Sequence, residues 1–171
     1  MSSRKESKQQ RRSTIMEKRR RMDQVASQII QGRIQRRLAI IEDLKQGLSI
    51  ALVSDAGMPG VCDPGEDIVN KVRSEKLDVI CIPGACAALT ALVSSGMPSS
   101  SFIFEGFLPK KQSEREKILT KISENEKTTI IYESPHRLKR LLRELYDFCG
   151  GEREIEIARE LTKKFEEHIG N

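Results

Sequence analysis

In the stretch "ALVSDAGMPGVCDPGEDIV", residues 51–69, an apolar run changes abruptly into a loop of small residues. The run predicts a buried strand that ends near Asp55. In the loop, Gly57 allows close approach of the backbone to a ligand, and Pro59 stiffens the chain. Two interpretations stay open at this point. The loop is either a ligand-binding loop at the carboxyl end of a strand or a tight strand-to-helix turn with Asp63 as the helix N-cap.

On both sides of this loop, strand patterns alternate with helix patterns, which predicts an α/β fold with a substantially parallel sheet. A helix with one apolar face is expected from about Met22 to Leu44, with Gly47 after it. Five strands are expected at 48–54, 78–82, 102–107, 127–134 and 154–160, and helices at about 65–75, 85–95, 112–123 and 135–148. A boundary between two α/β lobes is expected near 98–110, after a proline-containing loop.

The charge is divided unevenly along the chain. Residues 1–47 carry 13 basic against 5 acidic residues, whereas the remainder carries 17 against 20. Residues 1–22 have almost nothing apolar to bury and are predicted to be a disordered basic arm. Such an arm is either a solvated tail or an attachment site for a polyanion such as RNA.

The rest of the composition excludes several classes of protein. The apolar runs are too short to span a bilayer, and no signal peptide is visible at the start. The four cysteines form no C-x-x-C pair, so neither a disulfide framework nor a zinc site is expected. We therefore expect no metal and no membrane association.

Further small-residue or polar clusters follow the later strands. "CIPGACAAL", residues 81–89, places a turn and small side chains before a helix N-terminus, which suits either a ligand or close helix–sheet packing. "YESPHRLKR", residues 132–140, follows the strand "TTII" and combines acidic, hydroxyl and basic side chains. "ARELTKKFEEH", residues 158–168, mixes charges at the end of the last expected strand, and periodicity alone assigns it no function.

Taken together, "SDAGMPGVCDPG", "PGACAALTALVSSGMP", "FEGFLPKK", "YESPHRL" and "ARELTKKFEEH" resemble the tetrapyrrole methylase superfamily in order and spacing. More narrowly, they are similar to its ribosomal RNA branch, small-subunit rRNA (cytidine-2′-O)-methyltransferase I. The resemblance covers about residues 36–170. It implies a two-lobed α/β enzyme, a homodimer when complete, that binds S-adenosylmethionine between its lobes and acts on ribosomal RNA or the small ribosomal subunit.

The resemblance also implies roles for particular residues. The cofactor would be bound by the two small-residue loops and by a threonine that follows them, namely Ser54, Asp55, Ala56, Gly57, Met58, Pro59, Gly84, Ala85, Ala88 and Thr90. RNA would be contacted by basic residues of the linker and second lobe: Lys110, Lys111, Arg137, Arg159 and Lys163. A 2′-hydroxyl must lose a proton during methyl transfer, and Glu133, His136 or Glu160 could accept it. The sequence does not choose among these three.

Relatives begin with a strand and a glycine-bearing "P-I-G-N"-type loop, which the basic arm replaces in this sequence. We therefore expect a first lobe that lacks its N-terminal strand or strands and a truncated second lobe. The expected divisions are a basic arm at 1–22, a partial cofactor lobe at 23–105 and a partial second lobe at 106–171. The expected compartment is the cytoplasm, with a plastid stroma as the alternative because the arm resembles a transit peptide.

Two other functions compete with methylation. In the first, the protein is a non-enzymatic RNA-binding remnant that uses the basic arm. In the second, which "ESPHRL" and "ARELTK" argue against, a tetrapyrrole replaces RNA as the substrate.

Overall fold

The computed structural model describes residues 35–170, which divide into two compact units. The described part of the first unit comprises 35–52 and 66–80, and that of the second comprises 53–65 and 81–170. The basic arm expected at 1–22, and the part of the first expected helix that precedes residue 35, lie outside the described residues.

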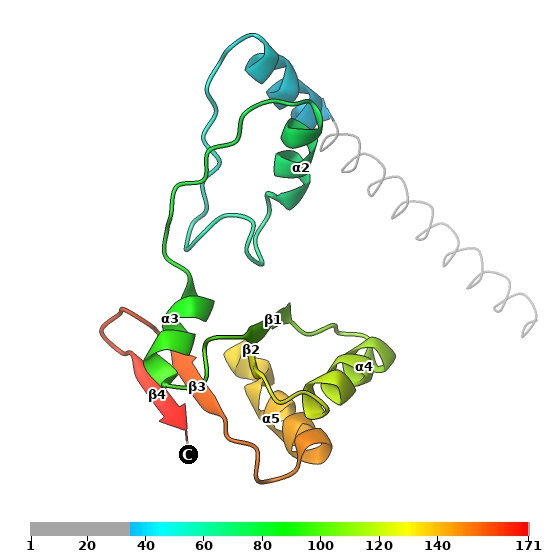
Figure 1. Ribbon diagram of the computed structural model, residues 1–171, viewed down its shortest axis with the longest axis vertical. Coiled ribbons are helices and arrows are strands. Elements are labelled where there is room, and N and C mark those ends of the chain that lie inside the picture. Colours follow the sequence, from blue (N-terminus) through cyan, green and yellow to red (C-terminus); the bar gives the residue numbers. More distant parts are fainter. Residues whose placement is uncertain (1–34, 171) are drawn as a thin grey trace, which may run out of the picture. The chain divides into compact units, whose positions relative to one another are not determined.

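The first unit contains two helices that are joined by ion pairs. A helix over 35–45 (blue in Figure 1) is followed by a turn that includes Gly47, as the sequence predicts, and α2 spans Glu66–Ser74. Arg37 pairs with Asp67, and Lys45 Nζ lies 3.0 Å from Glu75 Oε2. Hydrogen bonds from Lys71 and Lys45 lower the pKa of Glu75 to about 2. These pairs link the exposed sides of two short helices.

The second unit is built around two parallel strands, β1 (Phe102–Phe107) and β2 (Thr128–Tyr132). Helix α4 (Gln112–Ser123) connects them, and α5 (Pro135–Cys149) follows β2 with a proline in its first turn, where no amide donor is needed. The register runs from Phe102 opposite Thr128 to Phe107 opposite Tyr132, with an irregularity between Phe104 and Gly106. This β–α–β–α order confirms the predicted α/β class and its parallel pairing.

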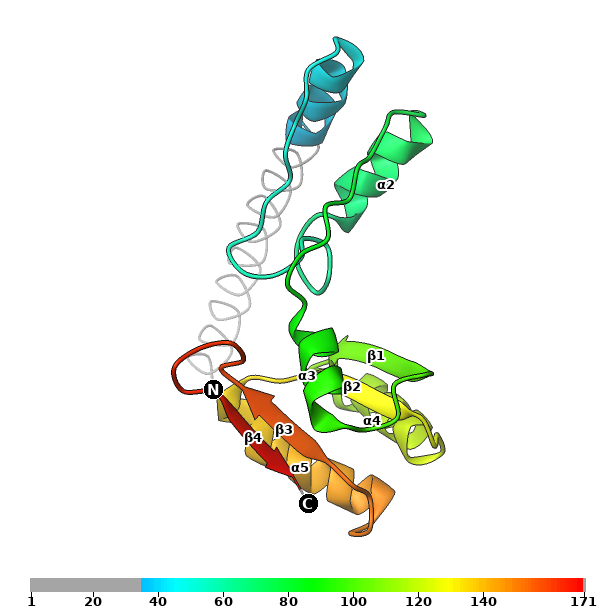
Figure 2. The same ribbon diagram turned by 60° about the vertical axis from the view of Figure 1, so that its left-hand side comes forward.

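The core of the second unit lies between the helices and the strand pair. Figures 1 and 2 show α4 and α5 side by side. Leu108, Leu119 and Leu141 form the buried cluster, with Ile131 of β2 packed against it. The leucines come from the end of β1 and from both helices, so one small core holds all four elements together.

The chain continues into an antiparallel hairpin, which corrects one expectation. Strand β3 (Glu156–Arg159) pairs with β4 (Glu167–Gly170), where the sequence predicted a polar tail behind a final strand. Earlier in the chain, α3 (Ala87–Ser95) forms the expected small-residue helix and ends at Gly96. The tail becomes a strand because β3, seven residues earlier, offers its edge as a partner.

The strands expected at 48–54 and 78–82 are wrong for this structure. Neither segment is a strand, and none of the strands within residues 35–170 pairs with either one. Their apolar side chains lie exposed, as at Val53, Ile80 and Ile82, each more than four-fifths accessible. A strand needs hydrogen-bonding partners for its backbone, and an apolar run does not supply them.

The proposed lobe boundary at 105/106 stays a prediction. No helix among the described residues is long and apolar enough to cross a membrane.

Candidate functional site

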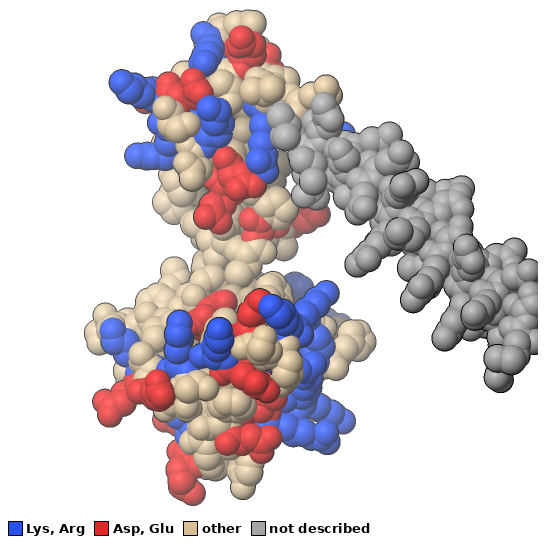
Figure 3. Space-filling model, turned by 90° about the vertical axis from the view of Figure 1, so that its right-hand side faces the viewer, with Lys and Arg blue, Asp and Glu red and all other residues tan. Residues whose placement is uncertain are grey.

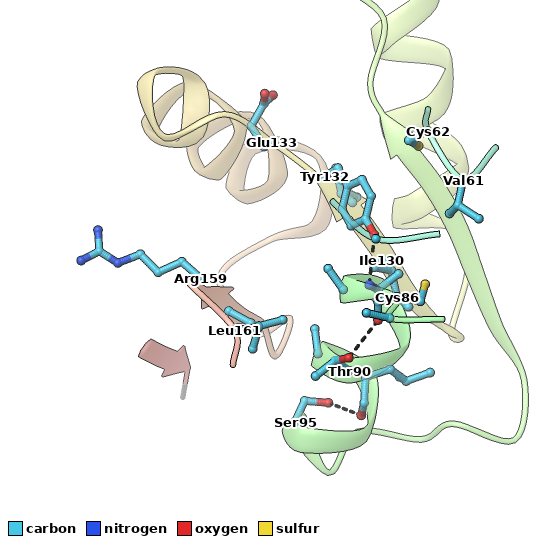
Figure 4. Close-up of a pocket in the computed structure, with 18 of the residues that line it drawn as sticks. Val61, Cys62, Cys86, Thr90, Ser95, Ile130, Tyr132, Glu133, Arg159 and Leu161 are labelled. Carbon is cyan, nitrogen blue, oxygen red and sulfur yellow. Dashed lines mark hydrogen bonds between the residues drawn. The ribbon is translucent and has the colours of Figure 1, made fainter. Parts of the chain in front are cut away.

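A cavity of about 670 Å³ lies within the second unit. It is lined by parts of 56–63, 85–97, 128–133 and 156–163, together with Phe107. Figure 4 shows α3 along one side, β2 with Tyr132 beside it, and Leu161 of the β3–β4 loop directed toward α3. The volume falls within the range of roughly 300–1,000 Å³ that is typical of small-molecule sites.

The glycine-rich loop lies against the turn that precedes α3. A Cβ on Gly57, whose φ is +81°, would be 3.4 Å from the Ala85 carbonyl oxygen. Farther along, a Cβ on Gly106 of β1 would come within 2.5 Å of Cys62 Sγ, which only glycine avoids. These two close approaches show that the loop lies directly against both the turn and the strand pair. The two small-residue loops of the sequence therefore share one cavity wall.

Tyr132 joins β2 to the start of α3. The Ala88 amide donates a hydrogen bond of 3.0 Å to the Tyr132 hydroxyl, while the N-cap Cys86 makes no side-chain capping bond. The Tyr132 ring packs edge-on against Phe104, with centroids 5.2 Å apart, and is tilted against Phe107 at 5.6 Å. Burial raises the pKa of Tyr132 above its ordinary value, so the phenol keeps its proton at neutral pH. A neutral hydroxyl thus satisfies one of the free amides of this helix.

Glu133 belongs to a buried network of charges rather than to the open part of the cavity. Its Oε1 accepts from Arg137 Nη2 at 2.7 Å and from the Ser134 amide at 2.8 Å. Arg115, 4% exposed, lies 3.6 Å from Glu133 Oε2 and donates to Glu144 at 2.7 Å. In Figure 4 the Glu133 carboxylate is directed away from Tyr132. The network links β2, α4 and α5.

Only some of the cofactor-binding residues implied by the resemblance line the cavity. Six of the ten line the cavity: Ala56, Gly57, Met58, Ala85, Ala88 and Thr90. The other four, Ser54, Asp55, Pro59 and Gly84, lie in the adjacent turns; Ser54 Oγ there bonds with the Ala56 backbone. Asp63 lines the cavity, and α2 begins three residues later at Glu66, so Asp63 is not its N-cap. This placement argues against the N-cap interpretation of the opening loop.

The candidate bases and RNA contacts are divided in the same way. Glu160 and Glu133 line the cavity, whereas His136, exposed at the start of α5, does not. Arg159 and Lys163 line it, and Lys110, Lys111 and Arg137 lie outside. In Figure 4 the Arg159 guanidinium is directed away from α3. The structure therefore brings together the β3–β4 loop and the two small-residue loops, but not the start of α5.

Sequence reasoning gave Tyr132 no role, although it named the residue in a polar cluster. The sequence feature that could have identified it is its position as the last residue of a strand. In α/β sheets, ligands bind beyond the carboxyl ends of the strands. Cys62, Leu161 and Phe107 were also missed, and nothing in their local pattern distinguishes them from core residues.

Comparison with known proteins gives consistent similarities. The family described as Tetrapyrrole (Corrin/Porphyrin) Methylases matches residues 3–171. A Vibrio cholerae protein named ribosomal RNA small subunit methyltransferase I is 50% identical over 132 residues, which are 77% of this chain and 46% of that protein. Proteins of the same name from Synechocystis and Haemophilus influenzae are 47% and 48% identical, over 80% and 77% of this chain. The chain spans about half the length of these curated relatives.

Proposed function

Because the chain belongs to the tetrapyrrole (corrin/porphyrin) methylase family, we propose that it serves S-adenosylmethionine-dependent 2′-O-methylation of a cytidine in small-subunit ribosomal RNA. The observation that carries this proposal is the cavity formed where the two small-residue loops meet α3. The substrate class comes from the relatives, whose name specifies ribosomal RNA of the small subunit.

The cofactor would lie along the wall made by the two loops. Gly57 and Ala85 keep this wall free of bulky side chains, and Thr90 lines the cavity one helical turn into α3. When bound, S-adenosylmethionine supplies an electrophilic methyl group on its sulfonium sulfur. The part of the chain that lines the cavity must then hold the acceptor hydroxyl in line with that methyl group and accept its proton.

Among the three candidate bases, the geometry favours Glu160. Both oxygens of Glu133 face cationic side chains or a backbone amide, and His136 lies outside the cavity. Glu160 lines the cavity, and within residues 35–170 its one ion pair is with Lys163 at 3.4 Å. Its carboxylate is about half exposed and can accept a proton from a nearby hydroxyl. Glu160→Gln is expected to slow single-turnover methyl transfer to small ribosomal subunits about a hundredfold without weakening cofactor binding.

RNA contacts are proposed for Arg159 and Lys163 at the cavity and for Lys110, Lys111 and Arg137 outside it. Four of the five pair with carboxylates, and Lys110 makes no ion pair with another residue in the described range 35–170. Figure 3 shows basic and acidic side chains interspersed on each unit. On the face that Figure 3 shows, phosphate contacts would be made at individual sites rather than through one large basic patch.

The test is a calorimetric titration of the 171-residue chain with S-adenosylmethionine. Ala85→Phe fills the cavity wall and is expected to weaken binding at least tenfold. The control Val93→Phe changes a residue that is 78% exposed and does not line the cavity, so it should bind like the unmodified chain. Equal binding by the two variants, or no binding by the unmodified chain, would contradict the proposal.

A second candidate, RNA binding without catalysis, is favoured by the concentration of basic residues at 1–47. It predicts an RNA affinity that falls steeply with salt and disappears when 1–22 are deleted. RNA binding that survives the deletion would exclude it. The complete protein is further proposed to be a cytoplasmic homodimer, or a plastid one, which sedimentation and localisation of a tagged chain would test.

A further inference from the structure

The loop between β3 and β4 has an unusual backbone where it lines the cavity. Glu160 and Thr162 have φ values of 50° and 64°, in the left-handed region that residues with a side chain rarely adopt. Residues 160–163 all line the cavity. A non-glycine residue stays in this region only when its surroundings hold it there, and such positions cluster at functional sites.

The Glu166 carboxylate is one of the contacts that hold this loop. The Thr162 amide donates to Glu166 Oε2, which fixes the backbone at one of the two strained positions. Two further turn bonds, from the Lys163 amide to Glu160 O at 2.9 Å and from the Glu166 amide to Lys163 O at 3.2 Å, close the loop. The Thr162 amide, followed by His168, lowers the pKa of Glu166. The ionised form of Glu166 is therefore the one that supports the loop.

His168 in turn holds Glu166. In the hairpin register His168 lies opposite Ala158, which places its ring on the same face as Glu156. Nδ1 lies 2.7 Å from Glu156 Oε1, and Nε2 lies 3.1 Å from Glu166 Oε1. An ionised carboxylate only accepts hydrogen bonds, and a neutral imidazole has one N–H. Both contacts are therefore hydrogen bonds only when the ring is protonated.

Glu156 of β3 and Glu166 of the loop are the charged groups that act on this ring. They raise the pKa of His168 above its ordinary value of 6.5, and the hydrogen bond that Glu156 accepts from the ring is the larger cause. Of the other charges of the hairpin, Arg159 pairs with Glu167 at 2.8 Å and Lys163 with Glu160 at 3.4 Å, while Lys164 Nζ lies 5.6 Å from the centroid of the Phe165 ring. A raised pKa means that the contacts are complete below about pH 6.5 and are lost as pH rises through the folded value.

We propose that Glu166 and His168 are positioning residues of the cavity. Glu166 holds residues 160–163 in their strained conformation through the Thr162 amide, and the protonated His168 ring holds Glu166, so that binding of S-adenosylmethionine weakens as His168 loses its proton. The inference rests on the proposed function for the identity of the ligand. The clamp itself, formed by Thr162, Glu166, His168 and Glu156, rests only on contacts within the hairpin.

The clamp can be tested without any ligand, by following the Thr162 amide of the 171-residue chain by NMR from pH 5.5 to 8.5. Its chemical shift is expected to titrate with the same midpoint as the His168 ring, above pH 6.5. In His168→Gln, which carries no titrating ring, the pH dependence should disappear. Glu167→Gln is the matched control, because this neighbouring carboxylate pairs with Arg159 and not with His168. A Thr162 signal that does not follow His168 in the unmodified chain overturns the proposal.

The consequence for the ligand is measured by titration with S-adenosylmethionine over the same pH range. We expect affinity to fall about threefold to tenfold across the His168 titration, the size of one hydrogen bond. In His168→Gln, the affinity for S-adenosylmethionine should be low and independent of pH. In Glu167→Gln, the affinity should depend on pH as it does in the unmodified chain. Binding that is independent of pH while Thr162 titrates refutes the positioning role. Absence of binding at every pH, with Thr162 titrating, refutes the proposed function and leaves the clamp in place.

Discussion

Two pairs of apolar segments in this chain have similar compositions and different structures. "FIFEGF" and "TTIIY" form the parallel strands β1 and β2, whereas "LSIALV" and "DVICI" form no strand within residues 35–170. The first pair contributes to a core in which Leu119 is fully buried. In the second pair, Ile80 and Ile82 are 87% and 81% exposed.

The difference lies in what accompanies each pair. Strands β1 and β2 are joined by α4, which packs with α5 on the same leucine cluster, so a complete crossover unit is present in about fifty residues. The segments 48–53 and 78–82 have no such partner among the described residues. An apolar run therefore becomes a strand only when a neighbour accepts its backbone hydrogen bonds.

The largest expected effect is in amide hydrogen exchange of the unmodified chain. Amides of β1 and β2 are expected to exchange more slowly than those of 48–53 and 78–82 by about a thousandfold or more, because opening the strands requires breaking the leucine core. Peptide-resolved exchange by mass spectrometry measures both regions in one sample. Comparable protection in the two regions would contradict this expectation, since it would mean that the exposed segments have a partner in solution.

The next effect concerns the buried charges that tie α4 to β2 and α5. Arg115→Met leaves Glu133, whose side chain is 4% exposed, without one of its cationic neighbours, and should cost about 4 kcal/mol of stability. Arg140→Met is the control, because Arg140 contacts the same Glu144 carboxylate at 2.9 Å from an exposed position and should cost less than about 1 kcal/mol. Exchange rates of α4 and α5 amides give both values. Equal losses of stability in the two variants would show that burial of Arg115 does not determine how strongly this network stabilises the protein.

A third effect compares the two regions directly through one truncation in each. Leu119→Ala creates a cavity in the core and should destabilise α4 by about 3 kcal/mol. Ile80→Ala removes a side chain that is already in solvent and should change stability by less than about 0.5 kcal/mol. Urea unfolding followed by circular dichroism measures the two variants against the unmodified chain. A costly Ile80→Ala would indicate that 78–82 is buried against something in solution.

The same comparison shows which parts of the structure the sequence predicts. The bounds of β1 and α4 agree with the expected 102–107 and 112–123, because their patterns are local and their partners lie nearby. Strand β4 was missed because residues 167–170 contain one large apolar side chain, Ile169, and because its pairing depends on β3 across a seven-residue loop. Local pattern carries no information about such a partner.

For the candidate site, the sequence indicated the small residues of the two loops but not the separate positions of the carboxylates. The glycine and alanine residues of the two loops were found because small side chains mark close backbone approach, as the Gly57–Ala85 contact illustrates. The sequence could not distinguish the roles of Glu133 and Glu160, because the residue type does not show whether a carboxylate lies in a buried network or in an open loop. The role proposed for Thr162 depends on its positive φ angle, which the residue type does not predict.

The smallest effect tests the bond between β2 and α3. Tyr132→Phe removes only the hydroxyl that accepts from the buried Ala88 amide, and should cost about 1 kcal/mol because that amide is left without its acceptor. Tyr146→Phe, at a ring that is 67% exposed on α5, is the matched control and should change little. Exchange of the Ala88 amide is expected to accelerate about fivefold in the first variant only. If Ala88 exchanges at the same rate in both variants, α3 is held by its contacts with the loops rather than by its hydrogen bond to β2.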